Sequence, residues 1–295
     1  MNKRKQILAG IMAVLMTAAA AAPVMAAEQK YCVALGADLK SEERETVLKL
    51  LNVTEDEVAE SSVTVTNTEE HEYLDDYLSQ SVIGSRALSS VFVREASEGY
   101  GIQVTTHNIS YCTTGMYQNA LATAGMKDAT VVVAGPFSLS GTAALIGAVK
   151  AYSEISGEPL KAEAVEAATE ELVTTGEVAE DIGSEDAEAL VGAVKDAIVA
   201  EGITDEEDIN KAIDEAAGKL NINLSEEDRQ KINDLMQKIG GLDLDVNQLK
   251  SQAKQLYDKL DDLNIDVSKE EVQGFLAKII AWIKQLFAQV NALKH

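Results

Sequence analysis

The sequence predicts an α+β or α/β protein in two parts: a mixed-sheet α/β domain at residues 27–156, followed by an all-helical bundle at 157–295. In the first part, short β-rich runs alternate with helical ones, and two neighbouring runs form an expected hairpin, which together indicate a mixed sheet. After residue 157, apolar residues recur at helical spacing and no convincing strand follows.

The first 26 residues predict a secretory signal peptide. Lys3, Arg4 and Lys5 precede the apolar stretch 7–22, and small residues around Ala26 provide a cleavage site. The apolar stretch is too short to span a bilayer, and no later run is long enough for a transmembrane helix. We therefore expect a secreted, extracellular protein whose mature chain starts near Ala27.

In the α/β part, alternation and helix-capping residues predict each element in turn. Thr66 ends an alternating strand, and Asn67 or Thr68 caps the helix that follows. Strands are expected at 30–35, 62–66, 88–95, 101–107 and 129–134, and helices at 41–51, 67–78, 115–124 and 141–152. The strands 88–95 and 101–107 form the expected hairpin, around the turn Ser-Glu-Gly-Tyr.

In the helical part, N-cap residues followed by an acidic residue three positions on mark helix starts, as Ser225 with Asp228 does. Helices are expected at 160–181, 184–201, 205–219, 226–239, 246–262 and 269–293. The segments 220–225, 242–247 and 263–268 each alternate apolar residues with Asn or Asp just before a helix. This weak repeat predicts similar connectors between stacked helices.

The charge balance excludes one class of partner. The chain has 49 acidic residues against 25 basic ones, a formal net charge of −24. Nucleic-acid binding requires clustered Lys and Arg, so we expect no nucleic-acid partner. The same excess opposes broad adsorption to an anionic envelope and is compatible with divalent cations, basic partners or plain solubility.

Cys32 and Cys112 are the only cysteines. An even number on the oxidising, exported side of a membrane permits one disulfide, worth roughly 4 kcal/mol in the chain-entropy model. The alternative is two buried free thiols.

A metal site is one hypothesis for the residues around His71. On a helix, His71 and Asp75 are i, i+4 neighbours on one face, with Glu72 as a base and His107 as a third ligand. This set is chemically admissible for zinc in a metal-assisted hydrolase. The alternative is a solvated first helical turn that complements the helix dipole.

A calcium hypothesis starts from Asp243, Asp245 and Asn247, which match the opening of a calcium loop. The match then ends, because Gln248 and Lys254 occupy the positions of the glycine and the bidentate glutamate. The chain therefore contains no EF-hand there. No resident cofactor is predicted, and a divalent cation, Ca or Zn, remains the only candidate.

The turn 135–142 between an expected buried strand and helix is a candidate anion-binding site. Backbone N–H groups and hydroxyls meet there, contributed by Ser138, Ser140, Gly141 and Thr142. It lacks the lysine of a phosphate-binding P-loop. The alternative is that Ser140 or Thr142 caps the helix while the small residues pack closely on the sheet.

The last expected helix carries a broad apolar face flanked by lysines. Such a helix either docks on a membrane surface or a partner, or closes its own bundle. The residues of this face include Phe275, Ile279, Trp282, Ile283, Leu286 and Phe287.

Five segments resemble the YpuA-like family of exported proteins, which occurs chiefly in Gram-positive bacteria and contains a domain of unknown function. They are 69–74 (EEHEYL), 83–87 (IGSRA), 106–110 (THNIS), 116–125 (MYQNALATAG) and 136–145 (PFSLSGTAAL). The resemblance covers nearly all of the mature chain and implies an extracytoplasmic protein. It assigns no catalytic residues.

Export, acidity, few histidines and the lack of a complete catalytic motif favour a non-enzymatic interaction or structural protein at the cell envelope or in the medium. The alternatives are an extracellular metal-assisted hydrolase and a peripheral membrane protein attached through its last helix. A protein or envelope surface is the expected partner.

Overall fold

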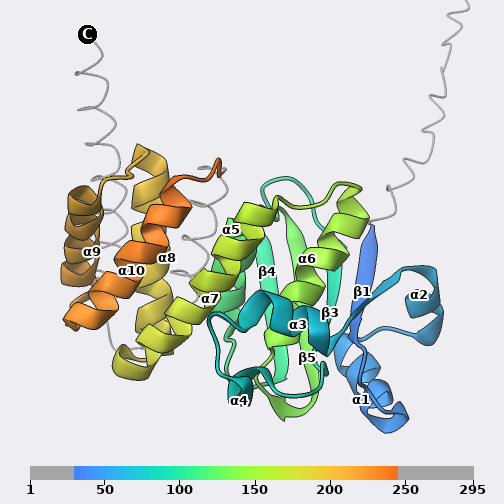
Figure 1. Ribbon diagram of the computed structural model, residues 1–295. Coiled ribbons are helices and arrows are strands. Elements are labelled where there is room, and N and C mark those ends of the chain that lie inside the picture. Colours follow the sequence, from blue (N-terminus) through green and yellow to red (C-terminus); the bar gives the residue numbers. More distant parts are fainter. Residues whose placement is uncertain (1–29, 245–295) are drawn as a thin grey trace, which may run out of the picture.

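The computed structural model describes residues 30–244, and within them a five-stranded mixed sheet is followed by four mutually packed helices (Figure 1). The strands are β1 (Tyr31–Gly36), β2 (Ser62–Val65), β3 (Ser90–Glu95), β4 (Ile102–Ile109) and β5 (Ala129–Leu139). The helices are α1 (Ser41–Leu51), α2 (Glu55–Glu60), α3 (Asn67–Leu74), α4 (Gln80–Ile83), α5 (Thr114–Thr123), α6 (Thr142–Ser156), α7 (Ala162–Ile182), α8 (Ser184–Glu201), α9 (Glu206–Leu220) and α10 (Glu226–Gly240).

The strand order is β2-β1-β3-β5-β4, which confirms a mixed sheet but makes the predicted hairpin wrong. β5 lies between β3 and β4: Ala129 is opposite Glu95 on one side and Ile102 on the other. The reason is burial, because Val131 and Val133 of β5 are completely inaccessible to solvent. A strand this apolar is stabilised at the centre of a sheet, so it displaces the local pairing of β3 with β4.

Helices cover both faces of the sheet. α5 and α6 pack on one face, and α1 packs on the other against β3 and β5. Gly147 of α6 allows a close approach, because a Cβ atom there would lie 3.0 Å from the Cβ of Ala34 in β1. On the opposite face, Val47 and Leu48 of α1 share a buried cluster with Val33.

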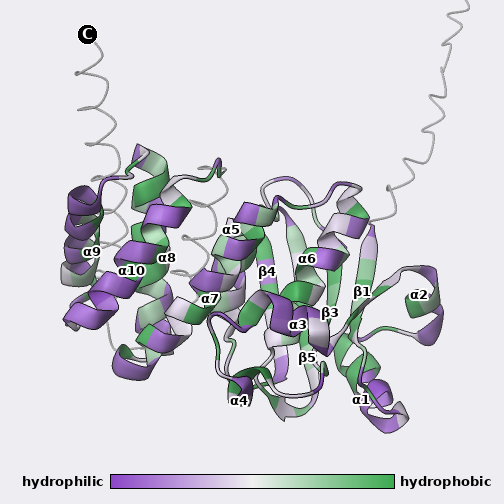
Figure 2. Ribbon diagram, viewed as in Figure 1, coloured by the Kyte–Doolittle hydropathy of each residue, from purple (hydrophilic) through white to green (hydrophobic). Residues whose placement is uncertain are grey.

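α7 to α10 pack against one another beside the sheet, and α7 packs on α5, which in turn packs on β4. In Figure 2 hydrophobic colour is visible on α8, on α6 and α1 and on parts of the strands, whereas the visible sides of α9 and α10 are mostly hydrophilic. Leu172 of α7 belongs to the core cluster of the sheet, and Val178, further along the same helix, belongs to the cluster of α8 to α10. The core therefore continues across the predicted boundary at residue 156, and the division into two domains stays a prediction.

A buried ion pair reinforces this connection. Lys195 Nζ of α8 lies 2.7 Å from Glu171 Oε1 of α7 and donates to the carbonyl oxygen of Asn119 at 2.9 Å and to Thr123 Oγ1 at 3.1 Å, both in α5. Thr123 in turn donates to Glu171. Three helices are thus joined through one fully buried polar network.

Most predicted elements are confirmed within residues 30–244, including α7 to α10 and the cap at Ser225, whose hydroxyl accepts from the Asp228 N–H at 3.0 Å. The predicted helix 67–78 ends earlier, at Leu74, and the short helices α2 and α4 were not predicted. The expected helices 246–262 and 269–293 lie outside the described residues. No helix between residues 30 and 244 combines the length and apolarity needed to cross a membrane.

Candidate functional site at the amino terminus of α6

A pocket of about 490 Å³ lies where α3 and α4 meet the connection from β5 to α6. It falls within the usual size range of small-molecule sites. Its wall consists mainly of hydroxyl-bearing and apolar side chains with one acid and one base. The lining residues include Glu70, Ser81, Val82, Ile83, Gly84, Ser85, Arg86, Leu88, Ser89, Ser110, Tyr111, Phe137, Leu139, Ser140 and Ala143.

Glu70 of α3 is the buried acid of this pocket, with 1% of its surface exposed. Its carboxylate accepts hydrogen bonds from Thr142 Oγ1 at 2.5 Å and Asn67 Nδ2 at 3.3 Å, and from the backbone N–H of Ala143. Burial raises the pKa of Glu70, and the hydrogen bonds oppose that rise only in part. Glu70 therefore fixes α3 to the first turn of α6.

The predicted anion-binding turn lies at this helix start. β5 continues through Ser138, and Gly141 takes a left-handed backbone conformation, with φ of +97°, as the N-cap of α6. Ser140 lines the pocket, with its hydroxyl 3.2 Å from that of Thr142. The anion that the helix terminus stabilises here is a side chain of the protein itself, Glu70. Binding of an external anion stays a prediction.

His71, the first predicted metal ligand, is hydrogen-bonded to Gly84 in the pocket wall. Its Nδ1 lies 2.5 Å from Asp75 Oδ1, and its Nε2 lies 3.1 Å from the carbonyl oxygen of Gly84. Both partners are acceptors, so both bonds form only when the two ring nitrogens carry protons. His107 lies on β4, in register with Ala134. Among residues 30–244 no group of three His, Cys, Asp or Glu side chains is arranged to hold a metal.

The His71 clamp predicts a pH dependence. Asp75 raises the pKa of His71 above its usual value near 6.5. The stability that protonated His71 contributes is therefore complete below pH 6.5. It is lost as the pH rises through the higher pKa that His71 has in the folded protein. We expect His71→Gln to flatten the pH dependence of the melting temperature above pH 6.5, measured by circular dichroism. The control is Ser97→Gln, a change to the same residue at an exposed position that does not titrate, which should retain the wild-type slope. An unchanged slope in His71→Gln would contradict the assignment.

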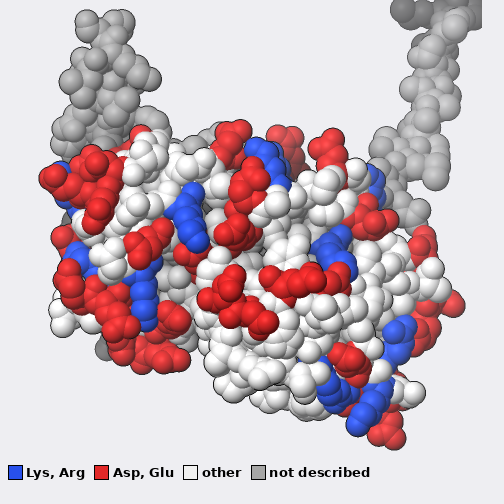
Figure 3. All heavy atoms as spheres, viewed as in Figure 1, with Lys and Arg blue, Asp and Glu red and all other residues white. Residues whose placement is uncertain are grey.

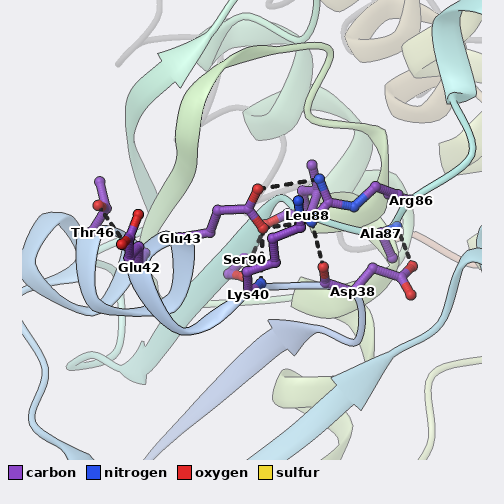
Figure 4. A network of polar contacts seen from close by, with 9 residues as sticks. All are labelled: Asp38, Lys40, Glu42, Glu43, Thr46, Arg86, Ala87, Leu88 and Ser90. Atoms are coloured by element: carbon purple, nitrogen blue, oxygen red, sulfur yellow. Dashed lines mark hydrogen bonds and ion pairs between the residues drawn. The ribbon is translucent and has the colours of Figure 1, made fainter.

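Arg86 is the one basic residue of the pocket wall, and it is bound by residues of α1 and of the segment just before α1 (Figure 4). Its guanidinium donates to Glu43 Oε1 and Oε2 at 3.1 and 2.5 Å and to the carbonyl oxygen of Asp38 at 2.6 Å. The Asp38 carboxylate accepts from the backbone N–H of Ala87. Arg86 lowers the pKa of Glu43, as expected for a paired carboxylate. The positive charge of the pocket is thus neutralised within the protein.

The strands and helices behind the pocket are poor in charge, unlike the rest of the molecule. The segments 99–126 and 129–149, which supply β4, β5 and most of α6, contain no Asp, Glu, Lys or Arg. In Figure 3 the surface over α4 and the adjoining end of the sheet is largely white, whereas acidic side chains cover the region of α9 and α10. The pocket therefore lies between this charge-poor part of the fold and the acidic helix α3.

The two cysteines are free and buried in this structure, as in the alternative to a disulfide, and their redox state in the exported protein stays a prediction. Cys32 lies at the start of β1, and the N–H of Cys112 bonds to Ser140, just after the end of β5. β1 and β5 both run antiparallel to β3, so the two thiols lie at opposite ends of parallel strands. That separation exceeds the Cα–Cα range of a disulfide, about 4.4–6.8 Å.

Thiol titration tests this arrangement. Burial raises the pKa of Cys112 to about 12 and also raises that of Cys32, so neither thiol ionises readily at neutral pH. We expect no reaction with a chromogenic disulfide reagent at pH 8 in native buffer and two thiols per chain in urea. Zero thiols in urea without reductant would show that the cysteines are bonded.

Sequence reasoning missed Glu70 as a site residue. Its position in the first turn of an acidic helix suggested a solvated carboxylate, and Glu69 does bond to its own helix start, at Thr66. Whether the neighbouring Glu70 points inward depends on where α6 lies, which no local pattern reveals. Of the calcium candidates, Asp243 is described, but Asp245 and Asn247 lie beyond the described range, as do the amphipathic residues from Phe275 to Phe287.

Comparison with known proteins places the chain in a family. Residues 35–256 match the family described as protein of unknown function (DUF1002). The chain is also 40% identical over 262 residues to the uncharacterized protein YpuA of Bacillus subtilis (strain 168), covering 88% of each chain. No solved structure matches. These matches confirm the resemblance inferred from the sequence: YpuA is a relative of the chain, and the chain belongs to the DUF1002 family.

Proposed function

We propose that this is an exported, non-enzymatic binding protein that acts at the cell envelope or in the surrounding medium, with the pocket beside Glu70 as its ligand site. The observation that carries the proposal is the pocket itself, which measures about 490 Å³, is lined by five serines and is backed by charge-poor strands and helices of an acidic protein. Export rests on the leader-like segment 1–26.

The pocket favours binding over chemistry. Glu70 is the one acid in its wall, and three donors hold its carboxylate at the start of α6. A general acid or base must exchange its proton with a bound substrate, and these donors compete with that contact. The hydrolase alternative requires a ring nitrogen of His71 free to bind metal, yet both nitrogens contact protein acceptors.

Export is tested by fractionating a culture of the producing cells. We expect the protein in the envelope or medium fraction with its amino terminus near Ala27, as determined by mass spectrometry. An intact amino terminus confined to the cytosol would contradict export.

Ligand binding is tested by saturation-transfer NMR with neutral sugars, dipeptides and polyamines as probes, and by titration calorimetry with inorganic phosphate. Ser85→Arg blocks the pocket wall from an exposed position, and Ser97→Arg makes the same change at an exposed position in the β3–β4 turn. We expect at least one probe class to bind the wild type and Ser97→Arg but not Ser85→Arg. Identical responses from all three proteins would contradict the pocket as ligand site.

A further inference from the structure

We infer that the ligand of this pocket is a neutral, hydroxyl-rich saccharide unit, free or within a glycan. This inference rests on the proposed function and names the ligand class for the same site. Three features of the described residues point to it: both charged groups in the wall are already neutralised, hydroxyls dominate the polar surface, and an exposed phenyl ring lines the pocket.

The charges of the wall leave little attraction for an ionic ligand. Arg86 bonds both oxygens of Glu43, so its positive charge is already paired within the protein. Glu70 is almost inaccessible and both of its oxygens accept bonds from the protein, so it offers little to an external cation. An anion would in addition approach a molecule with a formal net charge of −24. A neutral ligand meets neither obstacle.

The hydroxyls of the wall offer both hydrogen-bond roles. Ser110 Oγ donates to the carbonyl oxygen of Leu139 at 3.0 Å, which leaves its lone pairs as acceptors. Ser85 is exposed in the wall, so its O–H can donate to a ligand. Each hydroxyl of a sugar is likewise both donor and acceptor. A polyhydroxylated ligand therefore matches this wall better than a ligand with acceptors alone.

Phe137 supplies the apolar contact that a sugar ring needs. It is 49% exposed, the most exposed large hydrophobic side chain among residues 30–244. Tyr73 and Tyr100, which are nearly as exposed, carry a hydroxyl that water can solvate, whereas the phenyl ring of Phe137 has none. Specific sites combine an apolar surface with a few placed polar groups, and the C–H face of a sugar can cover such a ring.

The test is isothermal titration calorimetry of the full mature chain with N-acetylglucosamine tetramer and maltotetraose, with an alanine dipeptide and inorganic phosphate as other ligand classes. The variants are Phe137→Ala and, as the matched control, Tyr100→Ala, which removes an aromatic ring of similar exposure at the β3–β4 turn. We expect one of the saccharides to bind, Phe137→Ala to weaken it about tenfold, and Tyr100→Ala to bind as the wild type does.

The outcomes separate this inference from the proposed function. If the dipeptide or phosphate binds in the pocket and neither saccharide does, the ligand class is wrong while the pocket remains a binding site. If a saccharide binds but Tyr100→Ala and Phe137→Ala weaken it equally or not at all, the inference fails because the sugar does not contact the pocket wall. If no probe responds to Ser85→Arg, the proposed ligand site fails as well.

Discussion

Replacing Lys195 by methionine is expected to lower the free energy of unfolding by about 3–5 kcal/mol. The side chain is 1% exposed and pairs with Glu171, whose exposed surface is 0%. Removing the ammonium leaves the Glu171 carboxylate in the junction of α5, α7 and α8 without its cationic partner. Such a charge costs far more than a lost surface contact, and the expected result is a large decrease in the urea midpoint.

Two further variants make the measurement specific. The double variant Lys195→Met with Glu171→Gln removes the stranded charge and should recover much of the lost stability. Lys211→Met, at an ion pair exposed on α9, should change the urea midpoint little because solvent screens that pair. Equal midpoints for Lys195→Met and Lys211→Met would show that the pair in the junction is not a major stabilising contact.

Replacing Glu70 by alanine is expected to cost about 3 kcal/mol of stability. Thr142 Oγ1 and the backbone N–H of Ala143 lose their buried acceptor, and α3 loses its attachment to the first turn of α6. Thermal and urea unfolding measure the change. Glu57→Ala, which removes a similar capping carboxylate from the exposed start of α2, is the control and should cost clearly less.

Glu70→Gln separates the charge from the hydrogen bonds. Because burial raises the folded pKa of Glu70, its contribution to stability is complete below the unfolded value near 4.5 and is lost as pH rises through the folded pKa. Glutamine keeps an acceptor for Thr142 and has no such titration. We expect its stability relative to the wild type to increase between pH 4 and 7; a constant difference would contradict the raised pKa.

Local patterns in the sequence predicted much of the secondary structure. Period-two alternation identified β2, and helical spacing with caps such as Ser225 identified α7 to α10, because these signals depend on residues a few positions apart. The family resemblance followed from short segments in the same way and is confirmed. The hydroxyl-rich start of α6 was also recognised, but the predicted turn 135–142 began too early, because β5 continues to Leu139 and Gly141 is the N-cap.

Only the tertiary structure decided how these elements combine into a pocket. The sequence showed β3 and β4 as neighbours, but the burial of Val131 and Val133 places β5 between them. The sequence likewise permitted a disulfide between Cys32 and Cys112, but the order and direction of the strands place the two thiols far apart in this structure. Such outcomes depend on long-range packing, in which apolar burial outweighs local pairing preferences.

The same distinction explains the roles of Glu69, Glu70 and His71. These consecutive residues share one acidic helix start, yet Glu69 bonds to Thr66 within its own helix, Glu70 is buried against α6, and His71 holds the carbonyl of Gly84. The sequence determined that they form the beginning of a helix. Successive side chains on a helix point about 100° apart, so only the placement of α6 and of the Gly84 loop decided which of them enters the protein and contacts the pocket.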